Sequence, residues 1–229
     1  MNGGSAAGDM ATEGSIEGIR MKHYDIITEA EARVIDIGTT VTLNKGGHVT
    51  PLAQDTLRAR RITIVSDLPE SELNDLAPIA DVRRIAIGSD HSGVALKAAL
   101  RDALRSQGLA VDDVGTHGTD PVDYPDIAAR VSALVARKEV DAGIVIDGAG
   151  LGSAIAANKI DGVRAAMCTD RTLARYAREH NGANVLALGA TLVSIEEAKS
   201  IMQTWLATPM REARYIRRLA KIRHLERTR

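Results

Sequence analysis

Residues 143–158 read Gly-Ile-Val-Ile-Asp-Gly-Ala-Gly-Leu-Gly-Ser-Ala-Ile-Ala-Ala-Asn, and this stretch decides the fold. Its apolar start predicts a short strand that carries Asp147 into a glycine-rich turn, after which a helix begins. Glycines let the backbone approach a ligand closely, and the first turn of a helix presents free N–H groups. Asp147 therefore has two interpretations: a general base that faces backbone amides, or an aspartate that merely caps the helix.

The same alternation of strand and helix recurs from residue 83 onward. Apolar strand patterns lie at 84–88, 109–114, 143–146, 163–168 and 184–188, and helical patterns lie at 94–106, 127–137, 154–159, 172–179 and 195–206. Strands separated by helices of this length predict right-handed crossovers, and hence an α/β fold with a five-stranded parallel sheet covered on both faces. In such sheets ligands bind beyond the carboxyl ends of the strands, so we expect the site at that edge.

The chain ahead of this domain has a different character. Residues 1–21 are rich in Gly, Ser, Ala and acids and predict a disordered leader, with Met21 as an alternative start. Residues 22–66 predict a small α+β module with a capping box at Thr28-Glu-Ala-Glu31, a strand at 39–43, a Gly46-Gly47 turn, a helix at 52–60 and a strand at 61–66. Residues 67–82 are acidic and contain Pro69 and Pro78, which is typical of a linker. The predicted α/β domain then spans 83–229 and ends in a basic helix from Pro209.

Composition excludes several function classes. The net charge of −1 and an aromatic content of 2% argue against nucleic-acid binding, and no apolar run approaches the roughly 20 residues that cross a bilayer. Cys168 is the single cysteine, so neither an internal disulfide nor a cysteine metal cluster is expected. These properties favour a cytoplasmic protein that has no membrane segment.

Polar side chains gather where the predicted strands end. Asp90 and His91 follow the first strand, and this pair can hold sugar hydroxyls and move protons, or can be a capping aspartate beside a solvent-facing histidine. Asp123 and Tyr124 precede a helix, where a carboxylate and a phenol are available.

Two further constellations lie on predicted helices. His180 and Asn181 end the helical stretch 172–179, where a histidine can also serve only as a capping cation. Arg214 and Arg218 are four residues apart, which predicts one helix face that holds a phosphate or a merely solvated basic face.

These motifs occur in one order that closely resembles the type B ribose-5-phosphate isomerase family, which includes galactose-6-phosphate isomerases and tetrose-phosphate isomerases. The resemblance covers residues 83–229 and rests on these segments: Gly-Ser-Asp-His-Ser-Gly, Asp-Tyr-Pro, the glycine-rich turn, Ala-Ala-Asn-Lys, Gly-Val-Arg-Ala-Ala, His-Asn-Gly-Ala-Asn-Val-Leu-Ala-Leu-Gly and Arg-x-x-x-Arg. It implies a Rossmann-like three-layer α/β/α domain, no metal, no organic cofactor, and active sites shared between the subunits of a homodimer or tetramer. The implied reaction is the interconversion of a phosphorylated aldose and ketose through a cis-enediolate.

The resemblance also implies roles for individual residues. Catalysis falls to Asp147, to His180 as the group that opens the sugar ring, to Asp90, and to the loop amides around Gly148, Gly150 and Gly152. Substrate contacts fall to the remaining motif positions, His91, Asp123, Tyr124, Ala149, Asn158 and Asn181, and phosphate contacts to Arg214 and Arg218.

Two departures from the family pattern stand out. The best-known members carry a cysteine, the base that moves the C2 proton, where this chain has Asp147; we expect the apolar walls Ile144 and Ile146 to raise the pKa of this aspartate enough for the same work. Several relatives carry a phosphate-binding arginine where this chain has Thr191, which leaves open a tetrose, pentose or hexose phosphate as substrate.

Two alternatives to an isomerase remain. The first is a catalytically silent sugar-phosphate-binding relative, which the replacement at Asp147 makes possible. The second is a doubly wound receiver-type regulator, which is disfavoured because the first strand lacks a cluster of acids for Mg²⁺.

The module at 22–66 raises a separate question. It looks like short leading segments on some enzymes of bacterial microcompartments, and predicts docking or assembly, against a plain structural appendage.

Overall fold

The computed structural model describes residues 12–16, 19–66, 76–210 and 213–227. The chain divides into two compact units: residues 1–76 with 212–220, and residues 77–211 with 221–229. Helix α9 (Ala213–Arg227) contributes to both groups. We expected this helix to begin at Pro209; it begins at Ala213, and residues 208–210 precede it without helical structure.

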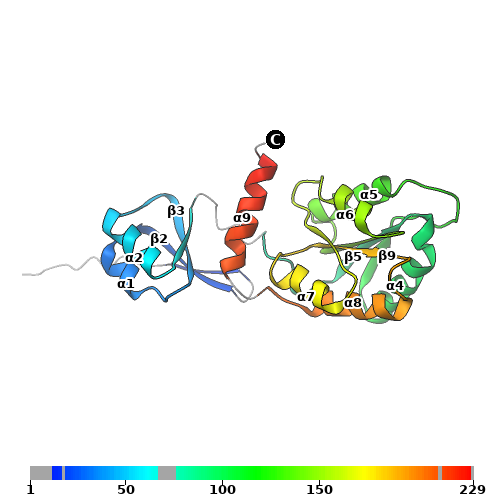
Figure 1. Ribbon diagram of the computed structural model, residues 1–229, viewed down its shortest axis with the longest axis horizontal. Helices are drawn as coiled ribbons and strands as arrows, with labels where there is room; N and C mark the ends of the chain where they lie inside the picture. Colours follow the sequence, from blue (N-terminus) through cyan, green and yellow to red (C-terminus); the bar gives the residue numbers. More distant parts are fainter. Residues whose placement is uncertain (1–11, 17–18, 67–75, 211–212, 228–229) are drawn as a thin grey trace, which may run out of the picture. The chain divides into compact units, whose positions relative to one another are not determined.

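The first unit is built on a four-stranded sheet in the order β1-β2-β3-β4 (Figure 1). Strands β1 (Thr12–Ile16) and β2 (Ile19–Ile27) are antiparallel, whereas β3 (Thr40–Val49) runs parallel to β2 and β4 (Thr63–Ser66) runs parallel to β3. Helices α1 (Glu29–Val34) and α2 (Pro51–Ala59) make the two crossovers. The buried core comprises Ile27, Ala32, Ile35, Val41, Leu43, Ala53, Leu57 and Ile62.

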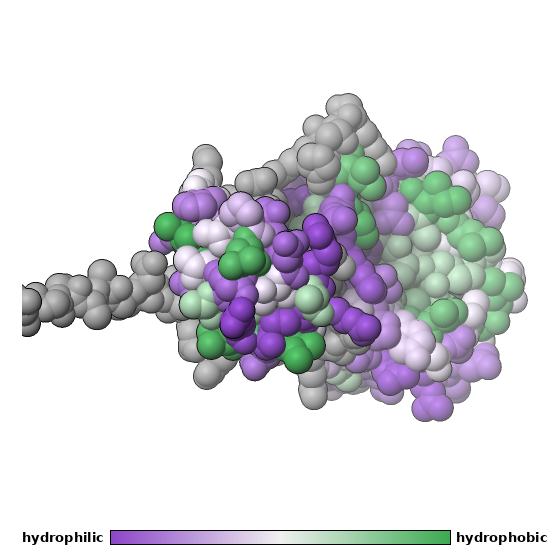
Figure 2. Space-filling model, turned by 60° about the vertical axis from the view of Figure 1, so that its left-hand side comes forward, coloured by the Kyte–Doolittle hydropathy of each residue, from purple (hydrophilic) through white to green (hydrophobic). Residues whose placement is uncertain are grey.

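Several local predictions for this unit are confirmed, and others are wrong. Thr28 and Glu31 form the predicted capping box, and helix α2 has Pro51 in its first turn. Residues 12–16 and 19–21 form strand rather than a disordered leader, because their backbones pair in the β1–β2 hairpin. Gly46 and Gly47 form no turn between elements; they lie inside β3, where its register against β2 shifts. The surface of this unit exposes Val34, Ile37 and Leu52, and the apolar residues seen in Figure 2 on the part turned towards the viewer are separated by hydrophilic ones.

The second unit carries the predicted five-stranded parallel sheet, in the order β6-β5-β7-β9-β8. Its strands are β5 (Arg84–Ser89), β6 (Ala110–Asp113), β7 (Ala142–Asp147), β8 (Ala165–Met167) and β9 (Val185–Gly189). Its helices are α4 (Val94–Ser106), α5 (Tyr124–Ala136), α6 (Leu151–Ala157), α7 (Arg171–Glu179) and α8 (Ile195–Ala207), with a short 3₁₀ turn η1 (His91–Gly93).

Alternation along the strands separates the core into two layers. Ile144 and Ile146 pack on one face with α4, α7 and α8, whereas Val145 packs on the other with α5 and α6 (Figure 1). Burial on both faces explains why the strand reads as one continuous apolar run. The Rossmann-like α/β/α prediction is confirmed.

The boundary between the units differs from the predicted linker at 67–82. Residues 67–75 lie outside the described part of the chain. Residues 77–82 belong to the second unit, where the Ile79 carbonyl accepts a hydrogen bond from Arg178 at 2.8 Å and Val82 packs on the core. Arg178 is itself fully buried and lies over the Trp205 ring, so this segment is fastened to α7.

None of the helices in the described ranges is both long and apolar enough to cross a membrane.

Candidate active site

The carboxyl edge of the second sheet brings together the predicted strand-end residues. Ser89 pairs with Ile146 and Asp147 pairs with Gly189, so β5, β7 and β9 end side by side. The Asp90 N–H donates to the Ile146 carbonyl at 3.0 Å, which ties the first strand end to the strand that carries Asp147. The site is therefore built on the three central strands, as expected for a parallel sheet.

The glycine-rich loop after β7 is clamped against its surroundings, and only glycine fits at two of its positions. Gly150 has φ +75°, and a Cβ there would lie 2.8 Å from the Leu188 carbonyl carbon. A Cβ on Gly152 would lie 2.5 Å from the Tyr124 ring. The glycines thus let the loop contact the end of β9 on one side and Tyr124 on the other.

Asp147 is buried at the centre of this loop, with 4% of the residue exposed. Its Oδ1 accepts hydrogen bonds from the backbone N–H of Ala149, at 2.8 Å, and of Gly150. Its Oδ2 accepts one from the backbone N–H of Ser153 at 2.8 Å, and the Ser153 hydroxyl also hydrogen-bonds to the carboxylate. The carboxylate is therefore surrounded by donors from the first turn of α6.

This geometry reverses the expectation for the pKa of Asp147. Burial raises it, but the hydrogen bonds from Ser153, Gly150 and Ala149 lower it by more, so the net pKa lies below the ordinary value of 3.8. Our prediction that Ile144 and Ile146 raise this pKa was wrong, because the donors of the loop outweigh the apolar walls. In this state Asp147 is an ionised, well-bonded carboxylate.

Asp90 and His91 stand beside this loop in a similar turn. Asp90 is 7% exposed, and its Oδ1 accepts from the Ser92 N–H at 2.9 Å and the Ser92 hydroxyl at 2.5 Å. His91 is exposed, and its Nδ1 accepts from the Val122 N–H at 3.4 Å. Asp90 thus caps η1, and His91 connects the first strand end to the loop that leads into α5.

Asp123 and Tyr124 begin α5 on the same side of the sheet. Both are exposed, and Asp123 makes no side-chain capping bond to the helix. A cavity of about 280 Å³ lies next to Asp123, and its lining includes the ionisable side chains of His117, Asp126 and Arg130.

His180, Asn181 and Asn158 lie elsewhere. Helix α7 starts beyond the carboxyl end of β8 and runs back, so its C-cap His180 lies near the amino ends of the strands. The His180 ring stacks on Tyr176 at 4.7 Å, and Asn181 Nδ2 donates to the Tyr176 carbonyl at 2.9 Å. Asn158 bonds twice with the Ala165 backbone, its Nδ2 donating at 2.9 Å and its Oδ1 accepting at 2.8 Å.

The structure thus divides the predicted residues between two edges of one sheet. The six residues of β7, at about 3.3 Å each, separate those edges by about 20 Å. The side-chain amide of Asn158 is engaged in joining α6 to the start of β8. A cavity of about 340 Å³ lies at this amino edge, and Asn158, Arg164, Asn181, Ile222, Leu225 and Glu226 are among the residues that line it.

Comparison with known proteins identifies the family to which the second unit is similar. Residues 85–222 match the family described as Ribose/Galactose Isomerase. The chain belongs to this family. It is 40% identical over 148 residues to ribose-5-phosphate isomerase B of Escherichia coli strain K12, which covers 65% of this chain and 99% of the relative.

Solved structures of family members agree with the fold. Ribose-5-phosphate isomerase B of Clostridium thermocellum is 48% identical with a TM-score of 0.63, and the match covers 63% of this chain and 98% of that one. The enzyme of Mycoplasma genitalium with bound ribulose-5-phosphate is 36% identical with a TM-score of 0.62, and covers 64% of this chain and 97% of its own. A D-erythrulose-4-phosphate isomerase of Pectobacterium atrosepticum is 40% identical over 124 residues, which is 53% of this chain and 81% of that protein.

The remaining family positions have mixed outcomes. The side chain of Arg214 lies outside the described part of the chain, and Arg218 is exposed with its guanidinium 5.6 Å from the Tyr215 ring centre. Thr191, the second departure, binds the glycine-rich loop: its hydroxyl donates to the Gly148 carbonyl at 2.6 Å. Phosphate binding by the two arginines stays a prediction.

Ser153 is a site residue that the sequence analysis missed. We predicted the helix from 154, whereas α6 begins at Leu151, so the Ser153 N–H is a first-turn donor. The sequence held a signal for this residue, because Ser153 directly follows the Gly-x-Gly-x-Gly turn. A helix start is assigned only to within a few residues, so Ser153 belonged among the first-turn candidates.

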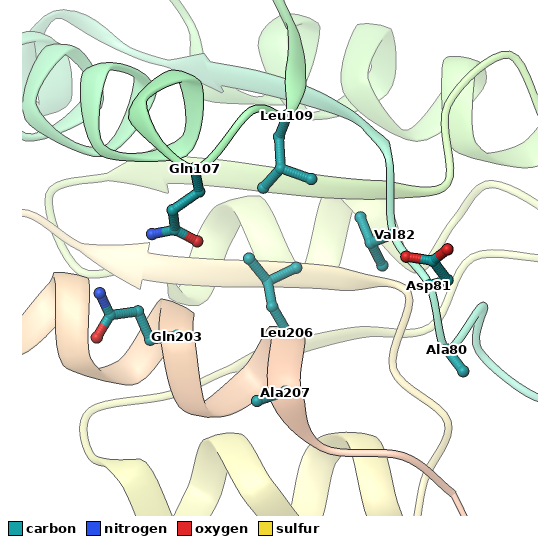
Figure 3. A pocket seen from close by; sticks show the side chains of 8 residues that line it. All are labelled: Ala80, Asp81, Val82, Gln107, Leu109, Gln203, Leu206 and Ala207. Carbon is teal, nitrogen blue, oxygen red and sulfur yellow. The ribbon is translucent and has the colours of Figure 1, made fainter.

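A further cavity of about 540 Å³ lies away from the carboxyl edge (Figure 3). Leu109 and Val82, which precede β6 and β5, face Leu206 near the end of α8, with Gln107 and Gln203 on one side. The cavity is therefore at the amino edge of the sheet and separate from Asp147.

Among the described residues, no group of three or more His, Cys, Asp or Glu side chains is placed to hold a metal ion.

Proposed function

We propose that this protein interconverts a phosphorylated aldose and ketose of four to six carbons, with Asp147 as the base that moves the C2 proton. The observation that carries the proposal is the buried carboxylate at the end of β7, held within a loop of backbone N–H donors. Family relatives named for ribose-5-phosphate and erythrulose-4-phosphate support this substrate class.

The proposed reaction needs a base, an oxyanion site and a group that opens the sugar ring. Asp147 takes the proton from C2, and backbone amides of the loop hold the negative charge that forms on the oxygen of C1. Transfer of the hydroxyl proton from the C2 oxygen to the C1 oxygen, and return of the abstracted proton to C1, give the ketose. His180 is the ring-opening group implied by the family, with Asp90 and His91 beside the sugar hydroxyls. No metal or organic cofactor takes part in the proposed mechanism.

The division of the site between two edges supports a shared active site. Asp147 and His180 cannot act on one sugar within a single copy, because they lie at opposite edges of the sheet. A second copy that presents its amino edge to the carboxyl edge of the first would complete the site. We therefore propose a homodimer, or a tetramer built from such dimers, with Asn181 contributed together with His180.

Phosphate recognition falls to α9 in this proposal. Arg214 and Arg218 are four residues apart on one helix, a spacing that suits a shared phosphate. Thr191 cannot provide the arginine contact of several relatives, and its hydroxyl is engaged with Gly148. The length of the phosphorylated chain is therefore the open variable, and tetrose, pentose and hexose phosphates belong in one assay.

Residues 22–66 are proposed to serve assembly. These residues carry none of the proposed catalytic groups and would dock the enzyme or add to its oligomer, as in a bacterial microcompartment within the cytoplasm.

A catalytically silent sugar-phosphate-binding relative is the second candidate function, and the lowered pKa of Asp147 is the observation that favours it.

The decisive test is turnover of a panel of phosphorylated aldoses and ketoses by the wild type and two aspartate variants. Asp147→Asn should lower kcat at least about 100-fold with little change in KM, because only proton transfer is lost. Asp170→Asn is the matched control, since Asp170 also follows a strand and caps a helix through the Thr172 and Leu173 N–H groups. Asp147→Asn with wild-type turnover would remove Asp147 from the mechanism, and a wild type inactive on the whole panel would favour the silent relative.

Asp147→Cys is the informative companion variant. Retained activity would mean that a thiolate and a carboxylate serve as bases from equivalent positions in this loop. Loss of activity, with the fold intact, would mean that the loop of this chain is adapted to the carboxylate.

A further inference from the structure

The backbone donors that the proposed reaction needs already have an acceptor. The N–H groups of Ala149 and Gly150 both point at Asp147 Oδ1. These are the loop amides that an oxyanion on the substrate would use. One donor set therefore faces two claims, one from the protein and one from the substrate.

We propose that the amides of Ala149 and Gly150 serve these two acceptors in turn: the Asp147 carboxylate in the free protein, and the substrate oxygen in the reacting complex. This inference rests on the proposed isomerase function and deepens it. It assigns to Asp147 a second role, as the occupant that keeps the oxyanion site filled until substrate arrives.

The amides themselves are fixed in direction, so the side chain must be the part that moves. The Gly148 carbonyl is held by the Thr191 N–H at 3.0 Å and the Thr191 hydroxyl at 2.6 Å. This carbonyl and the Ala149 N–H belong to one planar peptide group, so holding one end orients the other. Gly150 lies against the Leu188 backbone, which fixes the next peptide.

The two carboxylate oxygens divide the work. Oδ1 binds Ala149 and Gly150, whereas Oδ2 binds the Ser153 N–H at 2.8 Å. Rotation about the side-chain bonds of Asp147 can withdraw Oδ1 from the loop while Ser153 retains the other oxygen. Ser153 is then a positioning residue that keeps the displaced carboxyl group beside C2.

The exchange matches the movement of charge in the reaction. When C2–H breaks, its proton goes to Asp147 and its electron pair forms the C1–C2 double bond, while the carbonyl π pair moves onto the C1 oxygen. One negative charge leaves Asp147 and one appears on the substrate. The amides follow that charge, and no step leaves two anions competing for them.

The presence of the Asp147 carboxylate in the loop should also lower the affinity of the loop for anions. In the wild type, an anion that enters the loop must first displace Oδ1 from two N–H donors. In Asp147→Ala the same donors are available at once. A phosphorylated aldonohydroxamate, which imitates the planar enediolate, is a suitable probe because it binds without reacting.

The experiment compares the affinity of this hydroxamate for the wild type, Asp147→Ala and the control Asp170→Ala. We expect binding to Asp147→Ala to be at least tenfold tighter than to the wild type, and binding to Asp170→Ala to be unchanged. Equal or weaker binding to Asp147→Ala would overturn the inference. If the wild type turns over no sugar phosphate but tighter binding is still found, the proposed function fails and the shared donor set stands.

A second measurement needs no variant and covers the case in which Asp147→Ala fails to fold. In ¹H–¹⁵N spectra of the wild type, saturation with the hydroxamate should shift the Ala149 and Gly150 amide signals strongly, since their acceptor changes. The Ser153 amide signal should shift less, because its carboxylate partner stays. Ala149 and Gly150 signals that do not move on binding would refute the exchange.

Discussion

Lys97 and Asp113 form a buried ion pair beneath the carboxyl edge, and removal of the lysine charge tests what holds this edge in place. The Lys97 side chain is 2% exposed and that of Asp113 is 9% exposed. Asp113, at the end of β6, also accepts from the Gly115 N–H at 3.1 Å and from Arg101 Nη1 at 3.4 Å. Lys97→Met keeps most of the side-chain length and removes the charge.

We expect Lys97→Met to destabilise the second unit by about 3 kcal/mol. Loss of one partner from a buried pair costs about 3–5 kcal/mol, because the other charge is left uncompensated. The lower end applies here, since Arg101 and the Gly115 N–H still serve Asp113. At about 2–4 °C per kcal/mol, the midpoint of thermal unfolding should fall by about 6–12 °C.

The cost should also depend on pH. Burial raises the pKa of Asp113, but the hydrogen bonds from Lys97 and Gly115 and the charges of Lys97 and His117 lower it below 3.8 overall. A carboxyl group whose folded pKa is depressed stabilises the fold above its unfolded pKa, and loses that contribution as pH falls through the folded pKa. The difference between wild type and Lys97→Met should therefore be full at neutral pH and shrink below about pH 3.8.

Urea unfolding followed by tryptophan fluorescence measures this difference directly. Trp205 is the single tryptophan and is fully buried in the same unit as the ion pair. Lys199→Met is the matched control, because Lys199 pairs with Glu196 at an exposed site where such pairs contribute about 0–1 kcal/mol. A loss below about 1 kcal/mol for Lys97→Met, no larger than that of the control, would refute the reasoning.

Three further changes test the site and the organisation of the chain. Gly150→Ala should abolish most turnover, because φ +75° and a Cβ 2.8 Å from the Leu188 carbonyl carbon force the loop to shift; Gly118→Ala, where the nearest atom is 4.0 Å away, should keep wild-type kcat, and equal activity of the two would contradict the clamped loop. Arg218→Ala should raise KM for the phosphorylated sugar about 10- to 150-fold, the worth of a charge-assisted contact, and leave unphosphorylated sugar unaffected; equal loss on both sugars in the kinetic assay would assign the arginine to the fold. A protein that starts at Ala77 should retain turnover but change its oligomeric state, measured by light scattering, or its location in the cell; a folded and inactive product would place the residues before 77 in the active site.

The main sheet was predictable because its signals are local and repeated. Four of the strands from β5 to β9 are short apolar runs, and their length, together with the helical spacing of the segments between them, separates the two kinds of element. The strand β2 was missed although Ile19, Met21 and His23 alternate with polar residues in its sequence. Its parallel partner β3 lies in another segment of the chain, and pairing of that kind leaves no local pattern.

The candidate site was predictable only on its carboxyl edge. Asp90 and Asp147 follow neighbouring strands, so the rule for parallel sheets brings them together. The same rule sends the end of α7, and His180 with it, to the opposite edge, because a crossover helix runs antiparallel to the strands it connects. The resemblance implies a catalytic role for His180, and our proposal gives that role to the His180 of a second copy.

The two departures from the family pattern act on one peptide group, which the sequence shows as separate changes. Thr191 donates to the Gly148 carbonyl, and the N–H of the same peptide, on Ala149, donates to Asp147. A cysteine at 147 has one sulfur, a weak acceptor, and cannot bind Ala149 and Ser153 together as the two carboxylate oxygens do. Aspartate therefore fills the loop that a thiol would leave open, and threonine holds its peptide in the direction that suits the carboxylate. We infer that Thr191→Arg alone would disturb Asp147. The paired change Asp147→Cys with Thr191→Arg should therefore retain more turnover than either change alone. Additive losses in kcat/KM would show that the two positions act independently.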